Sequence, residues 1–544
     1  MALEITFGVL GGLGLFLYGM NLMGSGLQKS AGSKLKQIIE LLTSNKYMGV
    51  LVGTFVTAII QSSSATTVMV VGFVNAGIMQ LSQAIGVIMG ANVGTTITAQ
   101  LVSFKLTDFA PVAVGIGMII YLFNSKEKNK QMAEILIGFG ILFIGMDFLK
   151  DAVHPLREIE AFKDMLASFS HNPILGILMG FGLTVTVQSS SASMGILLAL
   201  ASTGMITIEA ALPILYGENI GTCTTALLSS IGATKNAKRA ATMHLIFNII
   251  GTLMFALVLN IPIRHIVLQL NPDDVARQIA NAHTLFNVLN VIIQIPLSGF
   301  IVKLALKLIP ETKDELLVEH KNTKYLDERI LETPSIAIVS VIKECLHMGK
   351  ETKISLKMSL DSFINLEKKD IQEIFKREKQ INLMEKEIVD YLVKLSKREV
   401  SASNRELIDG LFSTVNDIER VADHAENIAE LANVFIERKL SMSEDAKQDL
   451  IDMIDRVIKA YSSSLKAMRL GNKDLAFKVI SMEEQIDHME KSCRMNHIYR
   501  LNQNQCSTES GILYLDLLSN LERIGDHASN IARAVIDVQN MQSL

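Results

Sequence analysis

Two short polar motifs occur twice inside otherwise apolar segments of the N-terminal half. The run Gln-Ser-Ser-Ser-Ala at 61–65 recurs at 188–192, and a Gly-x-Asn-x-Gly-Thr element at 90–95 recurs at 217–222. For each motif, the second copy begins 127 residues after the first. A fixed offset between two different motifs indicates that one structural unit has been duplicated.

The residue types in these motifs suit an anion and cations bound side by side. Hydroxyls and backbone N–H groups at the start of a short helix can hold an oxyanion, whereas amide oxygens and unwound backbone carbonyls suit Na⁺. Segments 47–104 and 173–230 contain no Lys, Arg or Asp, and their acidic residues are Glu209 and Glu218 alone, so a site there must be built mainly from neutral groups. The predicted substrate- and ion-binding residues are Gln61, Ser62, Ser63, Ser64, Thr66, Asn92, Thr95, Gln188, Ser189, Ser190, Ser191, Asn219 and Thr222.

Packing is the alternative explanation for these residues. Small and hydroxyl-bearing residues are common where membrane helices approach one another closely. The matched duplication favours a binding site over packing alone. A second matched pair, His244 and His283, is followed in each case by Phe and Asn at the same spacing, and we interpret both histidines as partners of neighbouring helices rather than as ligands.

The apolar segments define the elements that must position these motifs. Only about ten to fifteen apolar residues flank each serine run, which is short for a helix crossing a ~30 Å hydrocarbon core. Each run is therefore predicted to be the tip of a re-entrant hairpin that lines a protected site. Full spans are expected at 5–28, 83–104, 109–123, 132–149, 207–230, 241–260 and 282–302.

Three full spans per copy would place the second copy upside down relative to the first. Loop charge agrees with this inversion, because basic and non-basic loops alternate along the chain. Segments 29–46, 124–131 and 232–240 sum to +3, +2 and +3, whereas 105–108, 151–172 and 261–281 sum to 0, −2 and 0. The pattern predicts an external N-terminus and a cytoplasmic C-terminal half.

The paired motifs resemble the signature of the type II sodium/phosphate cotransporter family over about residues 5–302. The resemblance implies Na⁺-driven symport of inorganic phosphate, with both hairpins meeting near mid-membrane around substrate and ions. Glu218 stands where the first copy has Ala91, and this difference would add a proton-sensitive or ion-binding group. The coupling stoichiometry and the choice between Na⁺ and H⁺ stay open.

The C-terminal part has a second internal repeat. From residue 335 onward apolar residues recur at helical spacing in six segments, which predicts two three-helix bundles. Residues 417–429 match 520–532 at an offset of 103.

Paired carboxylates lie within this second repeat. Glu419 with Asp423, and Glu522 with Asp526, are i, i+4 pairs that leave one helix face together. If pseudo-symmetry brings the two helices together, the four carboxylates would form a metal site. The alternative is a solvated acidic face paired with arginines. The doubled motif resembles the metal-binding pair of PhoU proteins, regulators of phosphate signalling, which implies a divalent ion or an iron cluster here.

The sequence thus predicts an all-α protein with a membrane transport domain at 1–310, a linker at 311–334 and a PhoU-like helical domain at 335–544. The membrane domain comprises repeat 1 (about 5–123), repeat 2 (about 132–260) and the span 282–302. The predicted localisation is the plasma (inner) membrane, multi-pass, with the C-terminal domain in the cytoplasm. A homodimer is left open.

The predicted function is sodium-coupled symport of inorganic phosphate, with the lipid bilayer as surroundings and the C-terminal domain as a phosphate-linked regulator. A symporter for another tetrahedral oxyanion and a membrane-anchored phosphate sensor are the alternatives. An enzyme is not expected, because the sequence has no P-loop, nucleophile elbow or His-Glu-x-x-His motif. A nucleic-acid partner is not expected either, because the formal net charge is only −4 and basic residues do not cluster.

Overall fold

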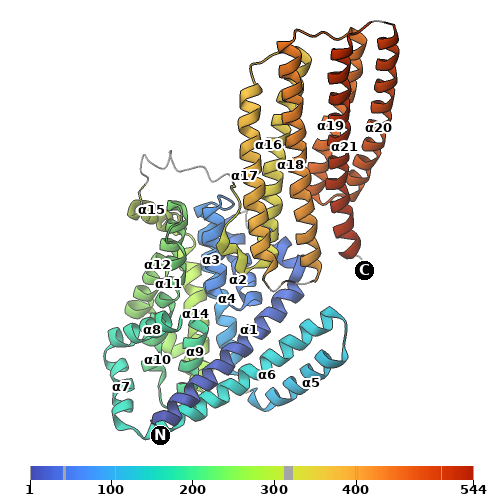
Figure 1. The fold of residues 1–544 in the computed structure, drawn as a ribbon. Coiled ribbons are helices and arrows are strands. Elements are labelled where there is room, and N and C mark those ends of the chain that lie inside the picture. Colours follow the sequence, from blue (N-terminus) through green and yellow to red (C-terminus); the bar gives the residue numbers. More distant parts are fainter. Residues whose placement is uncertain are drawn as a thin grey trace. The chain divides into compact units, whose positions relative to one another are not determined.

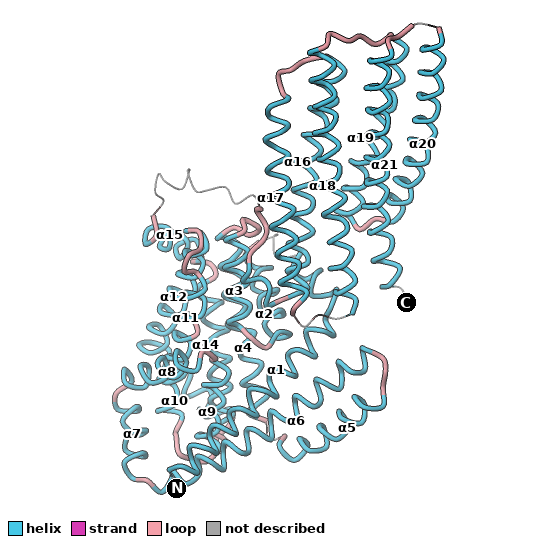
Figure 2. The backbone as a smooth tube through the Cα atoms, in the orientation of Figure 1, coloured by secondary structure: helices cyan, strands magenta, loops and turns pink. Residues whose placement is uncertain are grey.

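The computed structural model describes residues 2–40, 45–104, 106–310, 323–398, 400, 402–503 and 505–542, and the regular elements within those ranges are all helical (Figures 1 and 2). The all-α prediction is confirmed. The chain forms two compact units, Met1–Leu317 and Val318–Leu544. Of the predicted linker, residues 311–322 lie outside the described part of the chain.

The first unit contains both copies of the duplicated region. The first copy comprises α1 (Ala2–Glu40), α2 (Lys46–Ile60), α3 (Ser63–Asn75), α4 (Leu81–Ser103) and α5 (Ala110–Phe123). The second copy comprises α6 (Glu127–Val153), α7 (Glu160–His171), α8 (Pro173–Val187), α9 (Ser190–Ser202), α10 (Ile208–Gly221), α11 (Cys223–Ser229) and α12 (Lys235–Met254). A π-helical turn (Phe255–Leu259) and α13 (Asn260–Leu270) follow, then α14 (Val275–Gln294) and α15 (Ser298–Leu308).

The hairpins predicted around the serine runs are present. Helices α2 and α8 have 15 residues each, and α3 and α9 have 13 each. At about 1.5 Å per residue, even the longer arm spans only about 22 Å, which is less than a bilayer core. Each serine run therefore joins two helices that are both too short to cross the bilayer core.

Glycines hold each hairpin against the span that follows it. A Cβ atom added to Gly53 of α2 would lie 2.2 Å from the carbonyl oxygen of Val87 in α4. The equivalent glycine of the second copy, Gly180 in α8, would place a Cβ 2.0 Å from the carbonyl oxygen of Ile214 in α10. The duplication thus extends from sequence to packing, since both contacts recur at the 127-residue offset.

Within the described part of the chain, four helical segments are long and apolar enough to cross a membrane, or up to six if two bent pairs each count as one span. One bent pair corrects the predicted span 282–302: α14 ends at Gln294 and α15 begins at Ser298, at an angle of 84°. Pro296 lies in this break, and proline both lacks an N–H donor and clashes with the preceding helical turn. The predicted span 207–230 is likewise divided, because α10 ends at Gly221 and α11 begins at Cys223.

The described residues of the second unit form six long helices after a short 3₁₀ segment at Glu328–Glu332. The first three-helix bundle is α16 (Pro334–Asn365), α17 (Ile371–Ser396) and α18 (Ala402–Glu437), and the second is α19 (Glu444–Leu470), α20 (Lys473–Asn502) and α21 (Thr508–Gln542). The helices of each bundle contact one another, and α18 packs against α21 between the bundles. This arrangement confirms the predicted pair of three-helix bundles.

Candidate functional site

The two hairpin tips have the same local geometry. Gln61 and Gln188 end the first arms in the left-handed region, with φ of 58° and 56°. The next residue in each copy caps the second arm: the Ser62 hydroxyl accepts a hydrogen bond from the backbone N–H of Ala65, and Ser189 does the same for Ala192. Helices α3 and α9 consequently begin at Ser63 and Ser190, with the positive ends of their dipoles at the tips.

A small pocket lies between the two copies, where these helix starts meet the Gly-x-Asn-x-Gly-Thr elements. Three residues of the first copy, five of the second and one from α14 line it: Ser63, Asn92, Thr95, Ser190, Met194, Glu218, Asn219, Thr222 and His283. Matched residues of both copies therefore face one space. Ser191 lines an adjoining pocket together with Thr95, Met194 and His283.

Other predicted residues support the tips without lining the first pocket. Ser62 and Ser189 are the helix caps just described. The Thr66 hydroxyl pairs with Thr57 at 3.0 Å, and Gln61 accepts a hydrogen bond from the Thr98 hydroxyl at 2.8 Å. These contacts fix the turn and the two arms relative to each other. Ser64 and Gln188 complete the set that does not line either pocket.

The two tips differ in their surroundings. Each glutamine amide donates to a carbonyl of its own arm, Gln61 to Ala58 and Gln188 to Val185. Gln61, however, is buried with 8% exposure and also accepts a hydrogen bond from Thr98 of α4, whereas Gln188 is exposed. Thr225, the counterpart of Thr98, lies on α11 and donates to the carbonyl of Thr222. The first tip is therefore covered and the second is open.

The Gly-x-Asn-x-Gly-Thr elements are more helical than expected. In the first copy α4 continues through residues 90–95, and in the second the break falls only at Thr222. Polar side chains bond back to carbonyls one turn earlier, as Asn92 does to Ile88 and Thr95 to Ala91. The predicted unwound carbonyls are thus absent from the described first copy, because these side chains are accommodated within a continuous helix.

Sequence reasoning missed three lining residues: Met194, Glu218 and His283. The sequence indicates Glu218 as an added proton-sensitive or ion-binding group, although it is not in the predicted binding set, and His283 as a partner of neighbouring helices rather than a ligand. An aromatic cluster positions His283, since Phe286, one turn along α14, packs 5.4 Å from Tyr216 of α10 and 4.6 Å from Phe255, centroid to centroid. His244 instead lies behind the pocket, with its Nε2 3.3 Å from the amide nitrogen of Asn92.

The pocket combines neutral donors with one buried acid. Its lining residues include no Lys or Arg within the described chain, and Glu218 and His283 are its ionisable members. Glu218 is only 2% exposed, and neither carboxylate oxygen has a hydrogen-bond partner among the described residues. Nδ1 of His283 is buried and similarly unpartnered.

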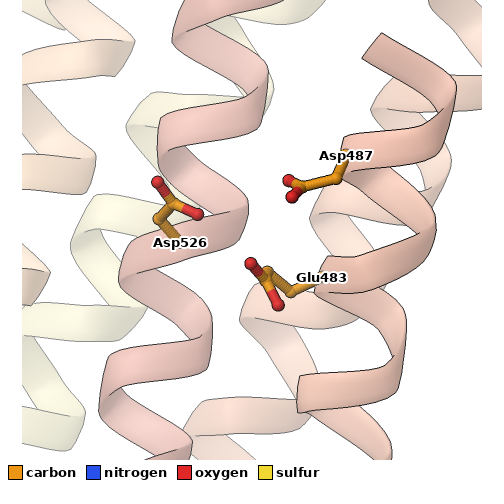
Figure 3. Close-up of side chains that lie close together, drawn as sticks. All are labelled: Glu483, Asp487 and Asp526. Atoms are coloured by element: carbon orange, nitrogen blue, oxygen red, sulfur yellow. The ribbon is translucent and has the colours of Figure 1, made fainter. Parts of the chain in front are cut away.

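The structure divides the four predicted metal-binding carboxylates into two sets. Glu419 and Asp423 of α18 interact with Glu385 and Glu378 of α17, whereas Glu522 and Asp526 of α21 interact with Asp487 of α20. Figure 3 shows Glu483 and Asp487 turned toward Asp526 across the two helices. Oxygen atoms of these three side chains lie within 4.8 Å of one another, so they could hold a cation together.

Crowding of these carboxylates shifts their protonation. Burial, followed by repulsion from Asp423, raises the pKa of Glu419 to about 7. Burial, followed by repulsion from neighbouring carboxylates, also raises the pKa of Glu522 and of Asp526. A divalent cation would relieve this repulsion, so the residues fit a metal site.

Histidines join the two bundles between these sets. Nδ1 of His424 lies 2.8 Å from the amide oxygen of Asn520, and Nδ1 of His527 lies 2.8 Å from a carboxylate oxygen of Asp417. The two imidazole rings are 5.6 Å apart, centroid to centroid. This reciprocal pairing occupies the contact between α18 and α21, so the carboxylate pairs face away toward α17 and α20 rather than toward each other.

Fold and site together define a polytopic membrane protein with a polar pocket between duplicated hairpins. A family model described as Na⁺/Pi-cotransporter matches residues 15–151 and 157–270, and a PhoU domain model matches 345–432 and 450–535. The Bacillus subtilis protein YqeW is 32% identical over 295 residues, covering 54% of this chain and 95% of that protein. The chain belongs to the Na⁺/Pi-cotransporter family and carries a C-terminal PhoU domain.

One further relative is similar over the full length of both chains, and a solved structure is similar over a smaller part of this chain. The Salmonella typhimurium protein YjbB, named for inorganic phosphate export, is 23% identical over 531 residues, covering 97% of each chain. The crystal structure of PhoU from Pseudomonas aeruginosa shows 27% identity and a TM-score of 0.35, and it covers 37% of this chain and 96% of that one.

Proposed function

We propose that this protein transports inorganic phosphate across the membrane together with Na⁺, using the pocket between the two hairpins. The observation that carries the proposal is the meeting of Ser63 and Ser190, the first residues of two duplicated half-helices, in one pocket. Family membership supports the substrate, and the described Na⁺/Pi-cotransporter model supports the coupling ion.

Phosphate would bind through hydroxyls and helix starts. Backbone N–H groups in the first turn of a helix lack partners within that helix, and the helix dipole favours negative charge there. Two such turns from opposite copies would hold an oxyanion from two sides. Because the described residues that line the pocket include no Lys or Arg, cations would enter with the anion to offset its charge.

Asparagine and threonine oxygens provide places for those cations. The Asn92 and Asn219 amide N–H groups donate to carbonyls of Ile88 and Leu215, which leaves the amide oxygens as ligand groups. Oxygen ligands suit hard cations such as Na⁺. Phosphate and Na⁺ would thus bind interdependently, because each reduces the electrostatic penalty of burying the other.

The decisive experiment is flux through purified protein in proteoliposomes. Labelled phosphate should accumulate when an inward Na⁺ gradient is imposed, and it should not when choline replaces Na⁺. Sulfate and arsenate added as competitors distinguish phosphate from another tetrahedral oxyanion. Binding of phosphate without flux would instead support a membrane-anchored sensor.

Phosphate export is the second candidate, because the full-length relative YjbB is named for it. The same vesicles, loaded with labelled phosphate, test direction. Efflux that proceeds without Na⁺, or against a large inward Na⁺ gradient, would favour export. Efflux that follows an outward Na⁺ gradient would show that the pocket couples the two ions in either direction.

The C-terminal unit is proposed to be a cytoplasmic regulatory domain that binds metal. Glu483, Asp487 and Asp526 would hold one cation, and Glu419 with Asp423 a second, with carboxylate oxygens as ligands. The cation would supply positive charge between otherwise repelling helices and so stabilise their packing.

A further inference from the structure

We propose that the Glu218 carboxylate binds one Na⁺ that moves with phosphate, so that this pocket couples one more cation than its two matched halves provide. The proposal rests on the proposed function, since it names a residue for coupling at the same site. It begins from a side chain that is 2% exposed, lines the pocket and has no partner for either oxygen among the described residues.

The two copies supply nearly matched ligand groups except at this position. Asn92 and Thr95 of the first copy correspond to Asn219 and Thr222 of the second, and all four line the pocket. One residue before each asparagine, the first copy has Ala91, which is fully buried, and the second copy has Glu218. The duplication therefore gives equal neutral oxygen ligands from each copy and one carboxylate from the second copy alone.

The negative charge of the Glu218 carboxylate requires a cation nearby. A buried carboxylate without a partner is strongly unfavourable, and phosphate entering the same pocket would repel it. Arginine and lysine, which neutralise most buried acids, are not among the described residues that line the pocket. A cation held at Glu218 removes both penalties at once, since it pairs with the carboxylate and attracts the phosphate.

The surrounding atoms favour Na⁺ as that cation. The Thr222 hydroxyl donates to the backbone carbonyl of Glu218 itself at 2.9 Å, which leaves its oxygen lone pairs available as an acceptor. Together with the amide oxygen of Asn219, these groups give a set of neutral oxygens around one carboxylate. Such a set suits a hard monovalent cation, and α10 ends at this same turn.

The test measures labelled Na⁺ and labelled phosphate uptake in the same proteoliposomes. Glu218→Gln keeps the shape and removes the charge, and Glu218→Ala installs the residue of the first copy. In both variants the number of Na⁺ ions carried per phosphate should fall by one. Glu209→Gln is the matched control, because Glu209 lies on the same helix, pairs with Arg264 at 2.7 Å and does not line the pocket. The number of Na⁺ ions that this variant carries per phosphate should equal that of wild type.

Two results would overturn the inference while leaving the proposed function intact: an unchanged ratio in both Glu218 variants, or a loss of proton coupling with Na⁺ coupling unaffected. Wild-type protein without Na⁺-dependent phosphate flux would instead overturn the proposed function. If the variants fold but do not transport, Na⁺ binding is measured instead by comparing the thermal stability of each protein in NaCl and in choline chloride. The Na⁺ concentration for half-maximal stabilisation should rise at least about tenfold in Glu218→Gln, and an equal value in variant and wild type would contradict the assignment.

Discussion

Ser63 and Ser190 occupy equivalent first positions of α3 and α9, and both line the pocket. Ser62 and Ser189, one residue earlier, turn their hydroxyls to cap the same helices. Neighbouring serines in one motif thus have different tasks. Sequence alone could place the motif at a site but could not separate these tasks, because the separation depends on the single left-handed residue that starts the turn.

Ser63→Ala and Ser190→Ala should each weaken phosphate binding about ten- to a hundredfold. Each substitution removes a donor to a charged ligand, which is worth roughly 1.5–3 kcal/mol. Phosphate dependence of flux measures the change. Ser202→Ala is the control, because its hydroxyl bonds to the Leu198 carbonyl near the far end of α9. Wild-type phosphate affinity in both tip variants would remove the tips from the site.

Glu419 should make the C-terminal unit less stable as pH rises in metal-free buffer. Its pKa is about 7 in the folded state against 4.5 ordinarily, so the folded state binds more protons between these values. The free energy of unfolding therefore falls by about 1–3 kcal/mol from pH 4.5 to 7. Unfolding of residues 318–544 by denaturant at several pH values measures this.

Substitution of Glu419 tests the source of that slope. Glu419→Gln should reduce the slope without abolishing it, because the pKa values of Glu522 and Asp526 are raised in the same direction. A wild-type unit whose stability is constant from pH 5 to 8 would show that these carboxylates are not held together in solution.

The sequence predicts the helices where the pattern of apolar and polar residues is confined to one segment of the chain. Short apolar arms around a polar run predicted hairpins, and the 127-residue offset predicted that one structural unit is duplicated. Bends were harder: hydropathy runs unbroken across Pro296, so 282–302 looked like one span. Metal sets were missed for another reason. Glu483 and Asp487 of α20 have the same four-residue spacing as the predicted pairs. In the first bundle Glu378 is followed at this spacing by Asn382, so this pair of acids is not duplicated in the sequence.

Gly180→Ala should prevent stable insertion of the second hairpin, whereas Gly182→Ala on the same helix should be tolerated. The added methyl would lie 2.0 Å from a backbone carbonyl at position 180 and meets nothing within 4 Å at position 182. Because backbone rather than a flexible side chain blocks it, α8 must separate from α10. Yield of monodisperse protein in detergent measures the effect, and equal yields of both variants would mean that the hairpin packs differently.

Asp526→Asn should remove metal from one bundle only. The substitution neutralises one of three acids that converge between α20 and α21, while Asp423→Asn affects the separate set between α17 and α18. Elemental analysis of full-length protein exposed to Fe, Mn, Zn and Mg should show a partial loss in each single variant and loss of both sites in the double variant. Asp516→Asn, an exposed acid on α21, is the control. Wild-type protein that retains no stoichiometric metal would identify these acids as a solvated face.

At the scale of the whole chain, duplication explains both units. Each unit is built from two similar halves. The pocket of the membrane unit lies where its halves meet, and in the C-terminal unit the carboxylate pairs of the two halves face the equivalent helices α17 and α20. In the membrane unit the two tips have the same backbone geometry but different surroundings, with Gln61 covered and Gln188 exposed. Two halves of one sequence pattern in two different environments are what a transporter needs if the site is to open first to one side and then to the other.

The orientation of the membrane unit in the bilayer depends on charge that is distributed over the whole of this unit. The basic segments 29–46, 124–131 and 232–240 alternate along the chain with the neutral or acidic segments 105–108, 151–172 and 261–281. Because lysine and arginine are retained on the cytoplasmic side, Glu158 should be outside and Asn236 inside. Both positions are exposed on the protein surface, so accessibility is not limited by burial. In a background with the four native cysteines replaced by serine, Glu158→Cys should react with an impermeant thiol reagent added to intact cells, and Asn236→Cys should react only after permeabilisation. The opposite pattern would reverse the orientation and place residues 323–542 outside while preserving the inverted repeat; reaction of both from one side would eliminate the inversion itself.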